Sequence, residues 1–219
     1  MKILHEDKDI IVCIKPSYAL SERTPDGNGF ADLLAKENGG YIGVVHRLDR
    51  GVGGVMVYAK TPSSAASLSR LVQQRNMKKE YLAVVHGCPA SASGTLTDLL
   101  FHDRRKNKTF VVDRVRNGVK EAVLDYTVEK TVRIEPFGAV SLIRISLRTG
   151  RTHQIRVQFA SRGLPLVGDG KYGASGDRCP IALFSTRLAF SHPVTGKAME
   201  FGALPEGGVW DALLEPSAD

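Results

Sequence analysis

A short charged segment enclosed by two apolar runs constrains the fold more than any other feature. His46-Arg47-Leu48-Asp49-Arg50 follows Gly43-Val44-Val45 and precedes Gly53-Gly54-Val55-Met56-Val57-Tyr58. Short runs of β-branched and aromatic residues are typical of strands, so the pattern predicts a loop between two strands. Such a loop can present a reactive side chain from a rigid sheet. Flanking arginines should keep Asp49 ionised, as a nucleophile or a base; a surface ion pair is the alternative interpretation.

The remaining patterns predict both strands and helices. Short apolar or alternating runs predict the strands Ile10–Ile14, Val44–Val45, Val55–Tyr58, Tyr81–His86, Leu124–Val132, Val140–Leu147, Ala182–Phe190 and Ala198–Phe201. Helices are expected at Phe30–Lys36, from Pro62 to about Asn76 with Thr61 as N-cap, and around Ile155 and Phe159 with Thr152 as cap. The 219 residues fit one or one and a half domains. Because no long linker divides the chain, we expect an α+β fold in a single domain over residues 1–219.

Charge points to a polyanionic partner. The 219 residues contain 30 Lys and Arg against 23 Asp and Glu, a formal net charge of +7. A basic segment, residues 101–120, concentrates this charge and interleaves it with Phe110-Val111-Val112, which favours a hairpin. Its cations are Arg104, Arg105, Lys106, Lys108, Arg114, Arg116 and Lys120. They are suited to phosphate contacts, although a solvated charged loop would have a similar composition.

Cysteine usage and hydropathy bear on location and cofactors. Three widely spaced cysteines, without a C-x-x-C pair, favour buried thiols in a reducing compartment over disulfides or a zinc site. We expect neither a signal peptide nor a membrane span. These patterns predict a cytoplasmic protein. We also expect a monomer that holds no metal and needs no cofactor.

A series of ordered blocks resembles the RluA-type family of pseudouridine synthases. The blocks are Glu6-Asp7 with Ile10-Ile11-Val12 and Lys15-Pro16, then His46-Arg47-Leu48-Asp49, then Lys79 to Gly87, then Thr149-Gly150-Arg151-Thr152-His153-Gln154-Ile155-Arg156, and finally the glycine-containing blocks Gly168–Gly173 and Phe190–Gly196. The resemblance covers roughly residues 3 to 205. No segment corresponding to the small N-terminal S4-type domain of many relatives is expected.

The resemblance implies a fold and an activity. The fold would be a long, bent, mixed and mostly antiparallel sheet with flanking helices and a central basic cleft. The activity would be isomerisation of a uridine in RNA, with Asp49 as catalytic carboxylate, Arg156 as its cationic partner and Tyr81 as the active-site tyrosine. Leu183 would pack on the base, although Phe184-Ser185 follow it where the family usually has His-Ala.

Other residues are candidates for substrate contact. His46, Arg47 and Arg50 adjoin Asp49, and Arg151 begins the last helix. Arg104, Arg105 and Lys106 of the basic segment are candidates for phosphate contact. A target base must leave its stack to reach a buried pocket, so an RNA stem–loop with unstacked bases, in transfer or ribosomal RNA, is the expected partner.

The chain departs from the family directly after the catalytic block. Val52-Gly53 stand where the family usually has Thr-Ser. Losing two hydroxyls and gaining a glycine predicts a more mobile loop. Two alternatives remain at this stage: a non-catalytic RNA-binding protein on the same scaffold, and a glycosidase. A glycosidase would need a second carboxylate, for which Asp169 is the nearest candidate.

Overall fold

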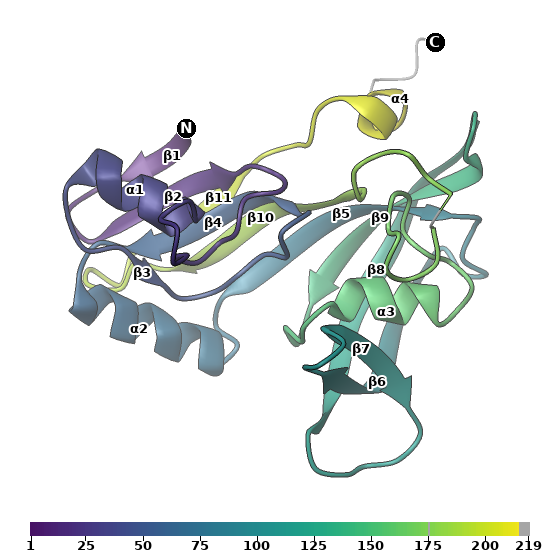
Figure 1. Cartoon of the computed structure of the whole chain (residues 1–219), viewed down its shortest axis with the longest axis horizontal. Coiled ribbons are helices and arrows are strands. Elements are labelled where there is room, and N and C mark those ends of the chain that lie inside the picture. The colour runs from purple at the N-terminus through teal and green to yellow at the C-terminus, as the bar shows by residue number, and fades with distance from the viewer. Residues whose placement is uncertain (175, 215–219) are drawn as a thin grey trace. The chain divides into compact units, whose positions relative to one another are not determined.

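The computed structural model describes residues 1–174 and 176–214, which divide into two compact units (Figure 1). Unit 1 comprises Met1–Glu80 and Phe184–Pro205, and unit 2 comprises Tyr81–Leu183 with the described residues from Glu206 on. The chain therefore passes between the units within strand β5 (Lys78–His86) and at the start of strand β10 (Leu183–Ser191).

Unit 1 is built on a mixed sheet. Its elements are β1 (Lys2–Glu6), β2 (Ile10–Lys15), α1 (Phe30–Asn38), β3 (Gly43–Val44), β4 (Gly53–Ala59), α2 (Pro62–Gln73), β10 and β11 (Ala198–Gly202). The strand order is β1-β2-β4-β10, with β3 also paired to β4 and β11 to β10. Only the β4–β10 pair is parallel among these described pairings, and the others are antiparallel.

Strand β4 forms the centre of unit 1, and all seven of its residues are buried. Val55 and Val57 pack with Leu68 of α2 on one face. The ring of Tyr58 meets that of Phe30 from α1, with centroids 6.0 Å apart. Helices therefore contact both faces of β4. A strand that is covered on both faces has a continuous apolar sequence, as β4 does.

The two glycines at the start of β4 allow strands to approach closely. Gly54 has φ +128°, and a Cβ there would lie 2.4 Å from the carbonyl oxygen of Ser185 in β10. A Cβ at Gly53 would lie 3.4 Å from the ring of Phe184. These glycines therefore belong to a packed strand, where they permit the β4–β10 pairing. Gly53, the glycine of the Val52-Gly53 departure, is thus a residue of strand β4.

Unit 2 is a largely antiparallel sheet with helices. Its elements are β5, β6 (Ser93–Asp103), β7 (Lys108–Val112), β8 (Val119–Ile134), β9 (Gly138–Leu147), α3 (Gln154–Ala160), η1 (Gly208–Trp210) and α4 (Asp211–Leu214). The order is β5-β9-β8-β6-β7. Strands β6, β7, β8 and β9 pair antiparallel, so the basic segment forms the hairpin that its apolar residues predicted.

Helix α3 is fixed to this sheet by apolar and polar contacts. Val157 packs with Leu100 and Ala122. The buried Gln158 donates from Nε2 to a carboxylate oxygen of Asp98, at 2.7 Å. The predicted cap is wrong, because the residue preceding the helix is His153, in a left-handed conformation, and not Thr152. By contrast, Thr61 caps α2 as expected, accepting from the amide of Ser64.

The α+β class and the expected strands and helices are confirmed, with boundaries shifted by a few residues. Strands β1 and β6 were not predicted from the sequence. Polar residues interrupt the apolar pattern of both strands, β1 has no buried residue, and one face of β6 is largely exposed. The longest described helix, α2, has 12 residues. Among residues 1–174 and 176–214, no helix combines the length and apolarity needed to cross a bilayer.

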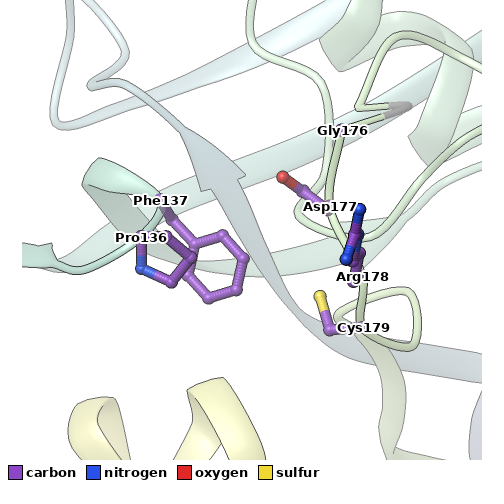
Figure 2. Close-up of a pocket in the computed structure, with 6 residues that line it drawn as sticks. All are labelled: Pro136, Phe137, Gly176, Asp177, Arg178 and Cys179. Atoms are coloured by element: carbon purple, nitrogen blue, oxygen red, sulfur yellow. The ribbon is translucent and has the colours of Figure 1, made fainter.

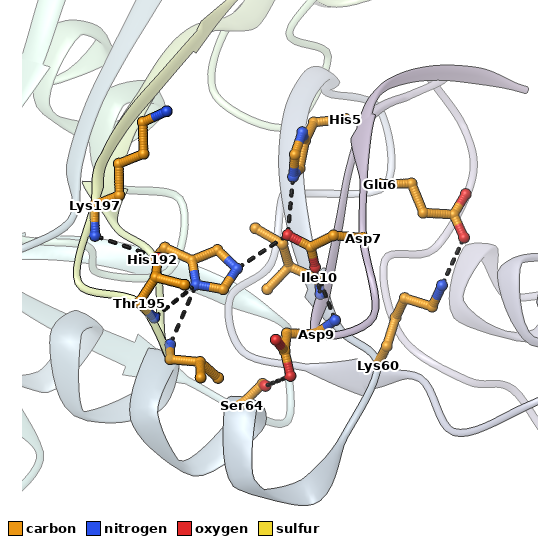
Figure 3. A network of polar contacts seen from close by, with 11 residues as sticks. His5, Glu6, Asp7, Asp9, Ile10, Lys60, Ser64, His192, Thr195 and Lys197 are labelled. Carbon is orange, nitrogen blue, oxygen red and sulfur yellow. Dashed lines mark hydrogen bonds and ion pairs between the residues drawn. The ribbon is translucent and has the colours of Figure 1, made fainter.

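A polar network ties the N-terminal hairpin of unit 1 to the end of β10 (Figure 3). Asp7 Oδ2 lies 3.0 Å from Nε2 of both His5 and His192, and its Oδ1 accepts the amides of Asp9 and Ile10. Asp7, Asp9 and His192 are close enough to hold a metal ion. However, Nδ1 of His192 accepts two backbone amides, so Nε2 carries the proton and donates to Asp7. The arrangement is that of a structural clamp.

This clamp predicts an acid-sensitive contribution to stability. Burial raises the pKa of Asp7, but its hydrogen bonds with His5, the two amides and His192 outweigh burial and hold that pKa well below its usual range. The stabilisation is therefore complete above the ordinary carboxyl pKa of about 4 and is lost as pH falls below it. Asp7→Asn should lower the free energy of unfolding near neutral pH, with a difference from wild type that shrinks below about pH 4.

Urea unfolding at several pH values measures this difference. Asp113→Asn, at a carboxylate that is 88% exposed, is the matched control and should stay close to wild type throughout. An Asp7→Asn difference that did not change with pH would contradict the ionic basis of the clamp.

Candidate active site

The predicted charged loop connects β3 and β4 in unit 1. Asp49 is partly exposed within it, and its carbonyl accepts the amide of Val52 at 2.9 Å, which closes a tight turn. Leu48 and Val52 are buried on either side. The alternation of buried and exposed residues therefore anchors the loop through apolar side chains and leaves the carboxylate accessible.

Ser21 holds the loop through the backbone of Leu48. Its Oγ donates to the Leu48 carbonyl at 2.9 Å and accepts the Leu48 amide at 3.0 Å. Ser21 is itself held by Tyr58 of β4, whose hydroxyl donates to the Ser21 carbonyl at 2.9 Å. A hydroxyl from a distant part of the sequence therefore tethers the loop despite Val52-Gly53. The tether holds the loop backbone at Leu48, and the mobility of the loop stays a prediction.

His46 is the first residue of the charged segment within this loop. It is buried, and its Nε2 accepts the amide of Val57 in β4 at 3.1 Å. Burial and the nearby charge of Lys79 lower the pKa of His46 well below its ordinary value, so the ring is neutral. This placement favours a role in joining the loop to β4 over the substrate contact that the sequence suggested.

Lys15 places a buried cation near Asp49, and sequence reasoning assigned it no role. Its side chain is fully buried at the end of β2, and Nζ donates to the carbonyls of Pro16 and Ala19 at 2.8 Å each. Burial lowers the pKa of Lys15 to about 8, and the negative charge of Asp49 opposes that shift. One sequence feature could have revealed this residue: the lysine directly continues a buried apolar strand. A charge at such a position is buried with the strand, and a buried charge needs partners.

The arginines that flank Asp49 bind the preceding segment of unit 1. Arg47 forms an ion pair with Glu22 at 2.8 Å, and both side chains are largely exposed. Arg50 donates from Nε to the carbonyl of Tyr18 at 3.3 Å. Pairs as exposed as Arg47–Glu22 contribute little to stability, so both arginines remain suited to contact a polyanion at the surface.

In unit 2, Arg156 is held by a carboxylate from a neighbouring loop. Its Nε and Nη2 each donate to Asp169 at 2.8 Å, and Asp169 has no exposed side-chain surface. The guanidinium also lies over the ring of Tyr172, 5.2 Å from its centroid. Bidentate pairing and ring stacking fix the orientation of an arginine more firmly than either contact alone. From the sequence, Asp169 was considered only as a second carboxylate for a glycosidase, and this role was missed.

Tyr172 also connects α3 to the basic segment. Its hydroxyl accepts the amide of Thr109 at 2.7 Å and lies 2.8 Å from Nδ1 of His153. Lys171 donates from Nζ to the carbonyl of Asn107. Arg104, Arg105 and Lys106 are exposed at the tip of this hairpin, where the amides of the last two bond to Asp103. The cationic tip is therefore attached to the loop that holds Arg156.

Three further predicted residues lie in unit 2. Tyr81 in β5 and Leu183 are buried, with 6% and 5% of their surfaces exposed. Arg151 donates from Nε to the carbonyl of Glu121 at the surface. The structure thus brings Lys15 and Ser21 to the Asp49 loop in unit 1, and Asp169 and Tyr172 to Arg156 in unit 2. The pairing of Asp49 with Arg156 stays a prediction.

A pocket in unit 2 contains none of the predicted site residues (Figure 2). It is lined by Pro136, Phe137, Gly176, Asp177, Arg178 and Cys179. Asp177 holds His86 at 2.8 Å and accepts the amide of Gly168 at 2.7 Å, so this carboxylate anchors the loop to β5.

The three thiols differ in exposure. Cys13 is buried, and burial raises the pKa of its thiol to about 12. Cys179 is half-buried and Cys88 is exposed. The expectation of buried thiols is therefore correct only for Cys13. Cys88 lies two residues after His86, the last residue of β5, and its side chain is exposed.

Comparison of the sequence with known proteins identifies relatives of this chain. A family model described as RNA pseudouridylate synthase matches residues 9–161. The RNA pseudouridine synthase YlyB of Bacillus subtilis is 34% identical over 219 residues, which cover 94% of this chain and 70% of that protein. Ribosomal large subunit pseudouridine synthase D of Vibrio vulnificus is 35% identical over 225 residues, covering 93% of this chain and 66% of that protein.

A solved structure supports the fold. Human RNA pseudouridylate synthase domain containing 1 has a TM-score of 0.78 and 23% identity, covering 94% of this chain and 83% of that chain.

The Ser21 tether predicts a measurable stability loss. Ser21→Ala removes both bonds to Leu48 and leaves its buried amide and carbonyl without this partner, which should lower the free energy of unfolding by about 1–3 kcal/mol. Ser63→Ala, at an exposed position of α2, should change it by less than about 0.5 kcal/mol. Chemical denaturation of the two variants provides the measurement, and equal stabilities would contradict the tether.

Proposed function

Because the chain belongs to the RNA pseudouridylate synthase family, we propose that it isomerises a uridine of ribosomal or transfer RNA, with Asp49 as the catalytic carboxylate. The family assignment makes it an isomerase that acts on RNA. The observation that carries the role of Asp49 is its placement: a partly exposed carboxylate on a tethered loop, beside the buried cation of Lys15.

The reaction conserves all atoms of the substrate. The bond between N1 of uracil and C1′ of ribose breaks, the base rotates, and a bond forms between C5 and C1′. The proton leaves C5 and a proton is gained at N1, so no oxidant or reductant is consumed. An ionised carboxylate can attack the sugar or the base, or can remove the 2′ proton. Asp49 is proposed to perform this step.

Residues of unit 2 are proposed to complete the site. Arg156, oriented by Asp169, is the proposed cationic partner of Asp49, because a guanidinium stays charged and binds carboxylates through paired hydrogen bonds. Tyr81 and Leu183 are proposed to contact the extruded uracil ring. Both units are proposed to form one catalytic domain, since the matched residues 9–161 belong to both. The cytoplasmic location and the monomeric state stay predictions.

RNA binding is proposed to involve both cationic surfaces. Arg47 and Arg50 adjoin the catalytic loop, and the tip of the basic segment carries three adjacent exposed cations. Lys and Arg gain affinity for RNA by releasing condensed counterions. The Vibrio vulnificus relative is named for the large ribosomal subunit, which supports a ribosomal RNA hairpin as one candidate substrate.

The catalytic role is tested by removing the charge of Asp49. Asp49→Asn should abolish pseudouridine formation and retain RNA affinity, because the amide keeps the shape but cannot act as a nucleophile or a base. Carbodiimide labelling and primer extension on unmodified transfer and ribosomal RNA detect the product and its position. Glu135→Gln, at a side chain that is 77% exposed, is the control and should retain activity. Equal activity in Asp49→Asn would overturn the assignment.

The basic segment is tested by charge reversal. Replacing Arg104, Arg105 and Lys106 with glutamate should weaken RNA binding and flatten its salt dependence, by about one unit of slope for each cation that pairs with a phosphate in the wild type. Binding titrations over a range of salt concentrations measure both effects. Arg133→Glu, at an arginine whose side chain is 79% exposed, is the comparison for a general charge effect. If both variants bind alike, the tip makes no specific contribution to RNA binding.

A further inference from the structure

Tyr18 is unusually exposed for an aromatic residue of this chain. Among the described Phe, Tyr and Trp residues it has the largest exposed fraction, 58%, followed by Tyr41 at 46% and Phe110 at 37%. Tyr41 packs along the backbone of Gly43, where a Cβ would lie 2.8 Å from its hydroxyl. One exposed ring needs no explanation by itself, so the backbone and the surroundings of Tyr18 decide whether the ring has a role.

The backbone of Tyr18 adopts a conformation that bulky residues avoid. Its φ is +68°, in the left-handed region that glycine enters without cost. The surroundings enforce this turn. Lys15 Nζ binds the carbonyls of Pro16 and Ala19, one on each side of Tyr18, while Arg50 Nε donates to the carbonyl of Tyr18 itself. Strained residues that are held so firmly cluster at functional sites.

This turn lies against the proposed catalytic loop. Arg50, which binds the Tyr18 carbonyl, directly follows Asp49. A Cβ at Gly53 would lie 3.2 Å from Oγ of Ser17, so the turn also contacts the first residue of β4. The turn that carries the exposed ring is therefore attached to the loop that carries Asp49. The cation of Arg50 lies beside this turn.

We propose that Tyr18 is a stacking platform for an unpaired RNA base close to the target uridine. The inference rests on the proposed function. Aromatic rings at RNA-binding surfaces stack on unpaired bases, and such stacking tolerates different base identities. An adjacent arginine suits the phosphate of the same nucleotide. A bulky ring in a glycine-like conformation is explained if the ring contacts substrate, since it adds no packing to the core.

The test separates stacking from folding. Tyr18→Gly removes the ring and the unfavourable φ together, so the free energy of unfolding should stay the same or increase. Affinity for a hairpin RNA with an oligouridine loop should nevertheless fall about tenfold or more. The slope of affinity against salt should not change, because no charge is lost. Tyr18→Phe keeps the aromatic ring and should therefore retain most of the wild-type affinity.

A second set of variants guards against indirect effects. Tyr18→Asn tolerates the left-handed conformation and lacks a ring, so it should match Tyr18→Gly in affinity. Tyr41→Leu, at the other exposed tyrosine, should bind as wild type does. Affinities of Tyr18→Gly and Tyr18→Asn within about twofold of wild type would overturn the proposal.

Turnover distinguishes this proposal from the proposed function. Both the proposed function and the stacking role are supported if the wild type forms pseudouridine and Tyr18→Gly raises the KM for RNA. In that case the free energy of unfolding of the variant, measured without RNA, should not be lower than that of the wild type. If the wild type binds the hairpin through Tyr18 but modifies no uridine in unmodified transfer or ribosomal RNA, stacking is supported and the proposed function fails. If pseudouridine forms with an unchanged KM in Tyr18→Gly, only the stacking role is overturned.

Discussion

The pair of hydrogen bonds between Ser21 and Leu48 is the constraint on which the arrangement around Asp49 depends. One buried hydroxyl satisfies both the amide and the carbonyl of the residue before the carboxylate. Tyr58 then joins Ser21 to the central strand β4. Because buried backbone groups are costly to leave unpaired, this chain of bonds fixes the loop to the most buried part of unit 1. A reactive carboxylate gains from such support, since catalysis requires a fixed geometry.

Buried charge is the second principle common to both units. Lys15 is a fully buried cation satisfied by two carbonyls, with Asp49 close enough to influence its pKa. Arg156 is a nearly buried cation satisfied by Asp169. Both cations are held by groups that do not belong to the proposed chemistry, so their positions do not depend on substrate. Polar contacts also hold the cations at the surface, because Tyr172 attaches the basic segment to α3.

Local patterns allowed much of the fold to be predicted. The buried run Val55–Tyr58 of β4, the cap at Thr61 and the hairpin of the basic segment follow from periodicity, capping chemistry and apolar interleaving. The support of the site could not be predicted in this way. Ser21 and Leu48 are 27 residues apart in sequence, and Asp169 reaches Arg156 across 13 residues. Such contacts are set by tertiary packing. A serine or an aspartate in a turn-like sequence does not predict them.

Amide hydrogen exchange at Leu48 tests the central claim most directly. In the wild type, the Leu48 amide should exchange far more slowly than the amide of the exposed Arg47 beside it, because its hydrogen bond to Ser21 must break first. In Ser21→Ala the two amides should exchange at similar rates, while amides within β4 stay protected. Rapid exchange of Leu48 in the wild type, or unchanged protection in the variant, would contradict the account of a loop held by Ser21.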